Sequence, residues 1–132
     1  MKDMKTMKLI PAHKHVARLE RPNILELDVD VDPRTVSLDG IKRIDLQFPT
    51  FTDGRAFSQA FLLRRRLGFK GEIRATGDVL ADQLRQLQRS GFSAAVLRAD
   101  QDLAIAQRQL EYFDAFYQGD AVTVQPRFLK AA

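Results

Sequence analysis

Hydrophobic and polar residues alternate with a period of two in two early segments of the chain, which predicts two β-strands. Residues 24–31 (ILELDVDV) place Leu and Val on one face and Glu and Asp on the other, and residues 41–48 (IKRIDLQF) repeat the pattern. Asp32 and Pro33 end the first strand, because proline restricts the residue before it and suits a first helical turn, here one that ends at Gly40. Each strand therefore has one apolar and one polar face.

After Pro49 the hydrophobic period changes to 3.6, which is typical of amphipathic helices. Asp53 and Asp100 are suited to cap helix starts, and glycines follow the expected helix ends. The pattern predicts helices over residues 54–67, 77–89 and 101–117, and strands over residues 71–75, 93–98 and, at the tail, 121–129.

Strands that alternate with helices through short loops indicate right-handed crossovers and a mostly parallel sheet. The fold class is therefore α/β, with three to four βα units. Five polar residues fall on the strand parity opposite to the apolar face: Asp45, Gln47, Glu72, Arg74 and Arg98. One sheet face is thus expected to be polar, which a half-barrel-like sheet allows and a sheet covered on both faces does not. An open, flavodoxin-like sheet is the alternative architecture.

The chain has 132 residues, of which 45% are hydrophobic and 29% charged, as expected for one packed domain. Its formal net charge is +4. Residues 1–22 hold six Lys or Arg against two Asp or Glu, so this segment accounts for the whole excess. The sequence therefore predicts a basic, extended N-terminal arm over residues 1–22 and a single, neutral α/β domain over residues 23–132.

The balanced charge of the domain makes a nucleic-acid partner unexpected, since binders of nucleic acid carry a basic face and usually a recognisable motif. The N-terminal lysines are not followed by the apolar stretch of a secretory signal, and no run of residues approaches a membrane span. A cytoplasmic location and no membrane partner are expected. A homodimer is also expected, because a charged sheet face needs solvent or a partner.

Several chemistries lack the residues that they need. The chain has no Cys, which excludes a disulfide framework, thiolate metal ligation and a thiol nucleophile. His13 and His15, on the predicted arm, lack the further ligands that a zinc site requires. Residues 28–39 resemble a calcium loop superficially, but Pro33 stands where such a loop needs Gly. No glycine-rich nucleotide motif is present. We expect no metal and no cofactor.

Charged residues gather where two predicted strands end and helices begin. These are the segments Thr52-Asp53-Gly54-Arg55 and Thr76-Gly77-Asp78, at the rim where α/β proteins bind ligands. Arg74 is expected to end its strand, so Arg55 and Arg74 could hold an anion. The candidate ligand-binding residues are Gly54, Arg55, Arg74 and Gly77, and the candidate proton-transfer residues are Asp53 and Asp78. Each also has a purely structural interpretation, as a helix cap or a turn.

Residues 53–74 are locally basic, with six Lys or Arg against two Asp or Glu. Arg64, Arg65 and Arg66 form a continuous run on the predicted helix and are candidates for partner binding. A solvated helix face is the simpler interpretation of such a run.

The same part of the chain resembles a bacterial domain of unknown function whose members are labelled probable oxidoreductases. Their genes lie beside those of assimilatory sulfite reductase and the sulfonucleotide reductase. The resemblance covers about residues 43–118 and is specific only in combination; it adds Ser58 to the candidate ligand-binding residues. The matching residues are Phe48-Pro49, Phe51, Asp53-Gly54-Arg55, Ser58, Ala60, Leu63-Arg64, Arg66, Gly68-Phe69, Gly71-Glu72, Arg74-Ala75, Gly77-Asp78-Val79, Asp82-Gln83, Gly91-Phe92 and Tyr117-Gln118.

The resemblance implies an accessory role in sulfate or sulfite assimilation. One hypothesis is a protein that binds sulfite reductase or its electron donor. The other is a small enzyme at the strand ends, in which Arg55 and Arg74 hold an anionic substrate and Asp53 or Asp78 moves a proton. The oxidoreductase label gains nothing from the residues, since neither cysteine nor a cofactor motif is present. Whether the protein is an enzyme is left open at this point.

Overall fold

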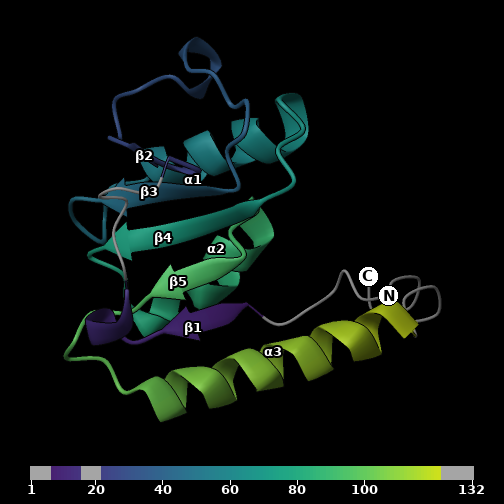
Figure 1. Cartoon of the computed structure of the whole chain (residues 1–132). Helices are drawn as coiled ribbons and strands as arrows, with labels where there is room; N and C mark the ends of the chain where they lie inside the picture. Colours follow the sequence, from purple (N-terminus) through teal and green to yellow (C-terminus); the bar gives the residue numbers. More distant parts are fainter. Residues whose placement is uncertain (1–6, 16–21, 123–132) are drawn as a thin grey trace.

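Five parallel strands form one sheet at the centre of the protein (Figure 1). The computed structural model describes residues 7–15 and 22–122. The strand order across the sheet is β1-β5-β4-β3-β2, and every neighbouring pair is parallel. The strands are β1 (Lys8–Ile10), β2 (Ile24–Leu27), β3 (Arg43–Phe48), β4 (Glu72–Gly77) and β5 (Ala94–Val96).

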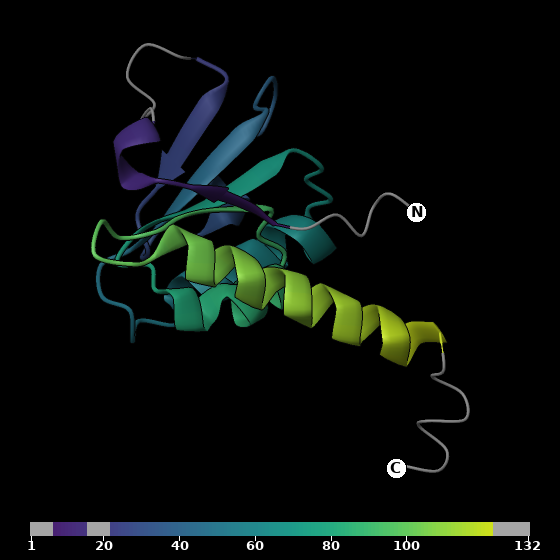
Figure 2. The ribbon, with the colours of Figure 1, turned by 90° about the horizontal axis from the view of Figure 1, so that it is seen from below.

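The helices lie on one side of this sheet (Figure 2). They are α1 (Arg55–Phe61), which continues into the π-helical turn η4 (Leu62–Arg66), then α2 (Leu84–Ser90) and α3 (Leu103–Val122). Short 3₁₀ turns occur at η2 (Ala12–Lys14), η3 (Pro33–Thr35) and η5 (Ala81–Gln83). None of the helices in the described ranges combines the length and hydropathy needed to cross a membrane.

The strand order explains why one face of the sheet is left without helices. From β2 to β5 each strand lies beside the one that precedes it in the chain. Right-handed crossovers that all step in one direction place their connections on the same face. From β2 to β5 the order therefore agrees with the half-barrel-like alternative. The step from β1 to β2 runs the other way, from one edge of the sheet to the opposite edge.

The hydrophobic core fills the space between the sheet and the helices. Ile44, Leu46 and Phe48 of β3 are fully buried there, as the alternation in the sequence predicts. Phe48 packs against Phe57 of α1 and Phe92, with ring centroids 5.1 and 5.8 Å away. Such aromatic pairs contribute about 0.5–1.5 kcal/mol each beyond their buried area. This cluster fixes α1 over the centre of the sheet.

The opposite face of the sheet is polar, as predicted. The register places Arg43 beside Glu72, and Asp45 between Glu26 and Arg74. Opposite charges on adjacent strands stabilise the sheet when they lie directly across from one another. We call this side of the sheet the polar face.

Several predicted boundaries are wrong. The strand predicted over residues 24–31 stops at Leu27, because the chain turns there and Val31 donates a backbone hydrogen bond to Asp28, 3.1 Å away. The helix predicted over residues 77–89 begins only with η5, after an extended segment. Asp102 rather than Asp100 caps α3, since its side chain accepts from the Ile105 amide at 3.1 Å. Gly54 takes the cap position of α1.

Part of the predicted N-terminal arm belongs to the sheet. Residues 8–10 form the edge strand β1, paired with β5 from Lys8–Ala94 to Ile10–Val96. The edge strand predicted over residues 121–129 lies almost entirely outside the described residues. The expectation of a homodimer stays a prediction.

Candidate functional site

The loop after β3 is held in place by two side chains from the segment after β4. The amide of Phe51 donates to Asp78 Oδ2 at 2.8 Å, and the carbonyl of Phe51 accepts from Gln83 Nε2 at 2.8 Å. Gln83 is itself fixed, because its Oε1 accepts from the Leu80 amide at 2.9 Å. The Phe51 ring remains 47% exposed. The rim thus presents the apolar side chain of Phe51, whose backbone amide and carbonyl are both held by hydrogen bonds.

Asp78 is also bonded to the loop that follows β5. Its Oδ1 accepts from Arg98 Nη1 at 2.7 Å, and Arg98 bonds to both carboxylate oxygens of Asp100. Asp100 and Asp78 together raise the pKa of Arg98, and Arg98 lowers the pKa of Asp100. Asp78 therefore serves as a tie between three loops, with both of its oxygens engaged.

Asp53 and Arg55 form a closed pair at the start of α1. Asp53 accepts from the Arg55 amide at 3.0 Å and from the Arg55 guanidinium at 3.1 and 2.7 Å. These hydrogen bonds lower the pKa of Asp53 to about 2. A carboxylate with so low a pKa is a poor general base or acid at neutral pH, where a pKa near the working pH is favourable.

The glycines at the rim differ in what they do. Gly77 has φ +92°, and a Cβ there would lie 2.5 Å from the Phe48 carbonyl oxygen, so a side chain would collide with β3. At Gly54 nothing lies within 4 Å of such a Cβ. Ser58 is exposed on α1. Gly77 therefore has a packing role, whereas Gly54 caps α1, where its carbonyl accepts from the Phe57 amide at 3.2 Å.

Arg74 does not end its strand. It lies in the middle of β4 on the polar face, because the strand continues to Gly77. Its Nε donates to Glu72 at 2.7 Å, and its Nη1 contacts His15 Nδ1 at 3.0 Å. Arg55 and Arg74 thus have separate partners on different elements, and the structure does not bring them together as a clamp for an anion.

The polar face carries a compact network of charges around Asp45, whose side chain is 3% exposed. Arg43 donates two hydrogen bonds to Asp45, at 2.8 and 2.9 Å. Glu72 contacts Lys8 at 3.4 Å as well as Arg74. Burial is the largest single influence on Glu72 and opposes its ionisation, but the hydrogen bonds and charges of Arg74 and Lys8 together lower its pKa. The charges of this network compensate one another, so it offers no surplus for an anionic ligand.

Of the three consecutive arginines, Arg64 is a structural residue. Its guanidinium donates to the carbonyls of Gly91, Phe69 and Gly71 at 2.8, 2.9 and 2.6 Å, and burial lowers its pKa. The Arg64 guanidinium is therefore engaged within the protein, and the exposed members of the run, Arg65 and Arg66, remain the candidates for partner binding. The Arg64 side chain joins the end of η4 to the loops before β4 and β5.

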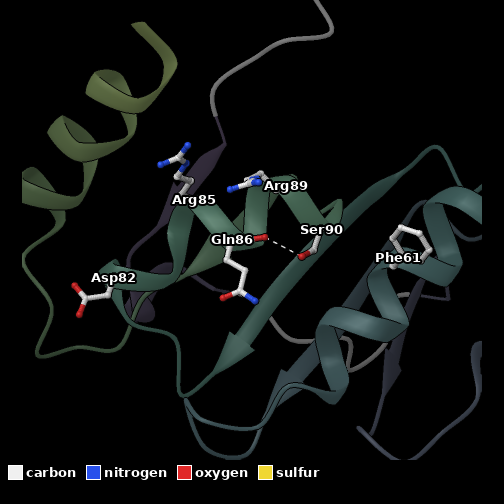
Figure 3. A pocket seen from close by; sticks show the side chains of 6 residues that line it. All are labelled: Phe61, Asp82, Arg85, Gln86, Arg89 and Ser90. Atoms are coloured by element: carbon white, nitrogen blue, oxygen red, sulfur yellow. Dashed lines mark hydrogen bonds between the residues drawn. The ribbon is translucent and has the colours of Figure 1, made fainter. Parts of the chain in front are cut away.

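Arg65 and Arg66 are exposed, and Arg65 lies beside a groove between α1 and α2. The Phe61 ring, 47% exposed, forms one side of the groove, and the Arg65 guanidinium lies 5.0 Å from its centroid. Arg85 and Arg89 project from α2 on the other side (Figure 3). We call Phe61, Arg65, Arg85 and Arg89 the arginine surface. The groove is lined by Phe61, Asp82, Arg85, Gln86, Arg89 and Ser90.

Among residues 7–15 and 22–122, no three His, Cys, Asp or Glu side chains come together as a metal-binding group. The residues that sequence reasoning missed are His15, Gln83, Arg85 and Arg89. Arg85 and Arg89 are four residues apart, a spacing that puts two side chains on one helix face. That spacing could have identified them, whereas nothing local marks the contacts of His15.

One family model matches most of the chain, over residues 24–128. Its description is "Bacterial protein of unknown function (DUF934)". The match includes β2, β3, β4, β5 and the three helices, and it begins after β1 and His15. No curated protein and no solved structure matches the chain.

Proposed function

The chain belongs to this bacterial family (DUF934), and on that premise we propose that it is an accessory protein of assimilatory sulfite reduction. It binds sulfite reductase or its electron donor in the cytoplasm and does not itself catalyse the reduction. The sulfur context comes from the resemblance over residues 43–118. The mode of action, partner binding, is supported by the arrangement of charges on the helical side of the protein.

The observation that carries the proposal is the arginine surface. Five other arginines each have a carboxylate within 4 Å: Arg34, Arg43, Arg55, Arg74 and Arg98. Within the described part of the chain, neither Arg65 nor Arg89 has such an ion pair. The one carboxylate in the groove belongs to Asp82.

Charge complementarity therefore fits an acidic protein surface as the occupant of the groove. Aromatic and arginine side chains are the residue types that most often dominate binding energy in protein interfaces. Phe61 supplies an apolar contact that is already exposed, and Arg65 stacks against it. A cationic rim also accelerates encounter with an acidic partner.

The alternative, a small enzyme that acts on an anionic substrate at the strand ends, has less support. Both candidate proton-transfer carboxylates are engaged by arginines, Asp53 by Arg55 and Asp78 by Arg98. Arg55, which would hold the substrate, is already neutralised by Asp53. A substrate anion would have to displace these pairs before it could bind.

The test is co-purification of the full-length protein with sulfite reductase and with its electron donor, each taken from the same bacterium. The variant Arg65→Glu/Arg89→Glu reverses two charges of the arginine surface. The variant Lys42→Glu/Lys70→Glu is the matched control, because it makes the same change in net charge at exposed positions before β3 and β4.

We expect the arginine variant to lose association at physiological salt and the lysine variant to keep it. Equal retention by both variants would contradict the arginine surface as the interface. Failure of the unchanged protein to associate with either enzyme would contradict the partner-binding function itself. Growth on sulfate after gene deletion, complemented by Asp53→Asn or Arg55→Ala, tests the enzymatic alternative, which predicts loss of growth.

A further inference from the structure

Residues 7–15 cross from the edge of the sheet onto the polar face, and we call them the strap. Met7 is buried in the core, and β1 pairs with β5. The turn η2 then reverses the chain and leads to His15, whose side chain is only 18% exposed. The view in Figure 2 shows η2, in purple, on the side of the sheet away from the helices.

The contacts of His15 define which form of the imidazole is bound. Arg74 Nη1 lies 3.0 Å from His15 Nδ1, and Asp45 Oδ2 lies 3.9 Å from His15 Nε2. A guanidinium can only donate, so Nδ1 must accept and carries no proton. Arg74 cannot rotate away freely, because its Nε is bonded to Glu72 at 2.7 Å. The bound imidazole is therefore neutral, with its proton on Nε2 toward Asp45.

We propose that the strap is a pH-sensitive clasp, closed while neutral His15 accepts the hydrogen bond from Arg74 and released when His15 takes up a proton. A second proton would occupy Nδ1, where it would face the Arg74 guanidinium instead of accepting from it. The hydrogen bond would be replaced by repulsion between two cations 3.0 Å apart.

Carboxylates near His15 raise its pKa in the closed state and so oppose release, but burial and the nearby arginines together lower it by more. Burial lowers the pKa of His15; Arg74 and Arg43 act in the same direction, whereas Asp45 and Glu26 act against them. The groups that face or surround His15 come from every neighbouring element. Those that act on His15 are Glu26 of β2, Arg43 and Asp45 of β3, and Arg74 of β4. Glu72 of β4 pairs with Arg74 and with Lys8 of β1, and His13 and Lys14 of η2 precede His15 in the chain.

Release would affect β1 and leave the remaining sheet in place. β1 has three residues and sits at the edge, where only β5 pairs with it. Its link to β5 includes the Lys8 amide on the Ser93 carbonyl, 3.0 Å, and the Leu97 amide on the Ile10 carbonyl, 3.2 Å. The match to the family model begins after the strap, at residue 24, so the strap is not part of the matched domain. Opening would uncover the edge of β5, which could then pair with another extended segment.

The test uses the full-length protein and two NMR measurements across pH 7.5 to 5. The first is the titration of the imidazole C–H signals of His15 and His13, the latter exposed in η2. The second is the hydrogen-exchange protection of the Lys8 and Leu97 amides, compared with the Glu72 amide, which donates to Lys42 at 3.0 Å between β3 and β4. His15→Gln keeps an oxygen acceptor for Arg74 but cannot titrate, and His13→Gln is its matched control.

We expect His15 to titrate below the ordinary histidine pKa of 6.5. As His15 protonates, protection of Lys8 and Leu97 should be lost while that of Glu72 is kept. His15→Gln should abolish this pH dependence and His13→Gln should not. The proposal is overturned if His15 titrates with a pKa at or above 6.5, if Glu72 loses protection together with Leu97, or if His15→Gln leaves the pH dependence unchanged.

Discussion

The side chain of Arg64 lies against the backbone of Gly91, which leaves room for it because glycine has no side chain. Arg64 Nε donates to the Gly91 carbonyl at 2.8 Å, and a Cβ at Gly91 would lie 2.6 Å from Arg64 Cγ. Gly91 ends α2 with φ +116°, so a glycine is favoured there by the left-handed backbone and also by the lack of room for a Cβ beside Arg64. This contact joins the end of the first helical unit to the end of the second.

Loss of this contact should therefore cost stability. Arg64→Ala leaves three backbone carbonyls without their donor, and we expect the free energy of unfolding to fall by about 2–3 kcal/mol. Arg65→Ala, one residue along, should change it by no more than about 0.5 kcal/mol. Urea denaturation followed by circular dichroism measures both, and equal effects of the two changes would contradict the structural role of Arg64.

A second prediction concerns the close approach of β4 to β3. Gly77→Ala introduces a Cβ 2.5 Å from the Phe48 carbonyl oxygen at a left-handed φ, so we expect a loss of more than about 2 kcal/mol. Gly40→Ala is the control, because Gly40 also has a positive φ of +75° but nothing within 4 Å of the added atom. Its cost should be about 1–2 kcal/mol, from backbone strain alone. A Gly77→Ala protein as stable as Gly40→Ala would show that the strand contact is unimportant.

On the polar face, Asp45 is the residue whose removal should matter most. Asp45→Ala leaves the Arg43 guanidinium on the sheet without its two acceptors, and we expect about 3 kcal/mol of destabilisation in thermal or urea unfolding. The exposed pair of Asp32 and Arg34 provides the comparison, and Asp32→Ala should have a much smaller effect. The distinction depends on burial, since both carboxylates bind an arginine two residues away.

The pair of Asp53 and Arg55 should make the stability of the protein depend on pH in the acid range. The pKa of Asp53 in the folded protein is about 2, below its ordinary value of 3.8. The pair therefore contributes stability above about pH 3.8, and that contribution is lost as the pH falls through 2. Asp53→Asn should remove this part of the acid dependence. A carboxyl carbon shift of Asp53 that titrates near pH 4 or higher would contradict the closed pair and would revive Asp53 as a proton-transfer group.

The sequence predicted the alternation of strands and helices and the polar face, because both follow from a periodicity of several residues. The place of β1 could not be predicted, since three residues are too few to show a period and its partner β5 is distant in the chain. Successive side chains of the helical turn η4 project in different directions, so Arg64, Arg65 and Arg66 cannot all face inward. The run of three arginines in the sequence does not show which side chain faces inward.

For the candidate site, the sequence placed Asp53 and Asp78 at the rim after two strands, and both lie there in the structure, although Asp78 precedes an extended segment and does not begin a helix. The pairings of the arginines were not predicted. Arg98 reaches Asp78 across 20 residues of sequence, and Arg74 bonds to His15 across 59. Pairings of this kind depend on which strands become neighbours, and a single sequence contains no direct record of that.

The position of β1 also sets the order in which the sheet can be completed during synthesis. β1 is the first strand to be made, yet its only neighbour in the sheet is β5, the last. At about 5–20 residues per second, roughly 4–17 s separate the synthesis of Lys8 from that of its partner Ala94. The strands β2, β3 and β4 can pair in sequence during this interval. Of the five strands described, β1 is therefore synthesised first and yet can pair only after β5 has been made.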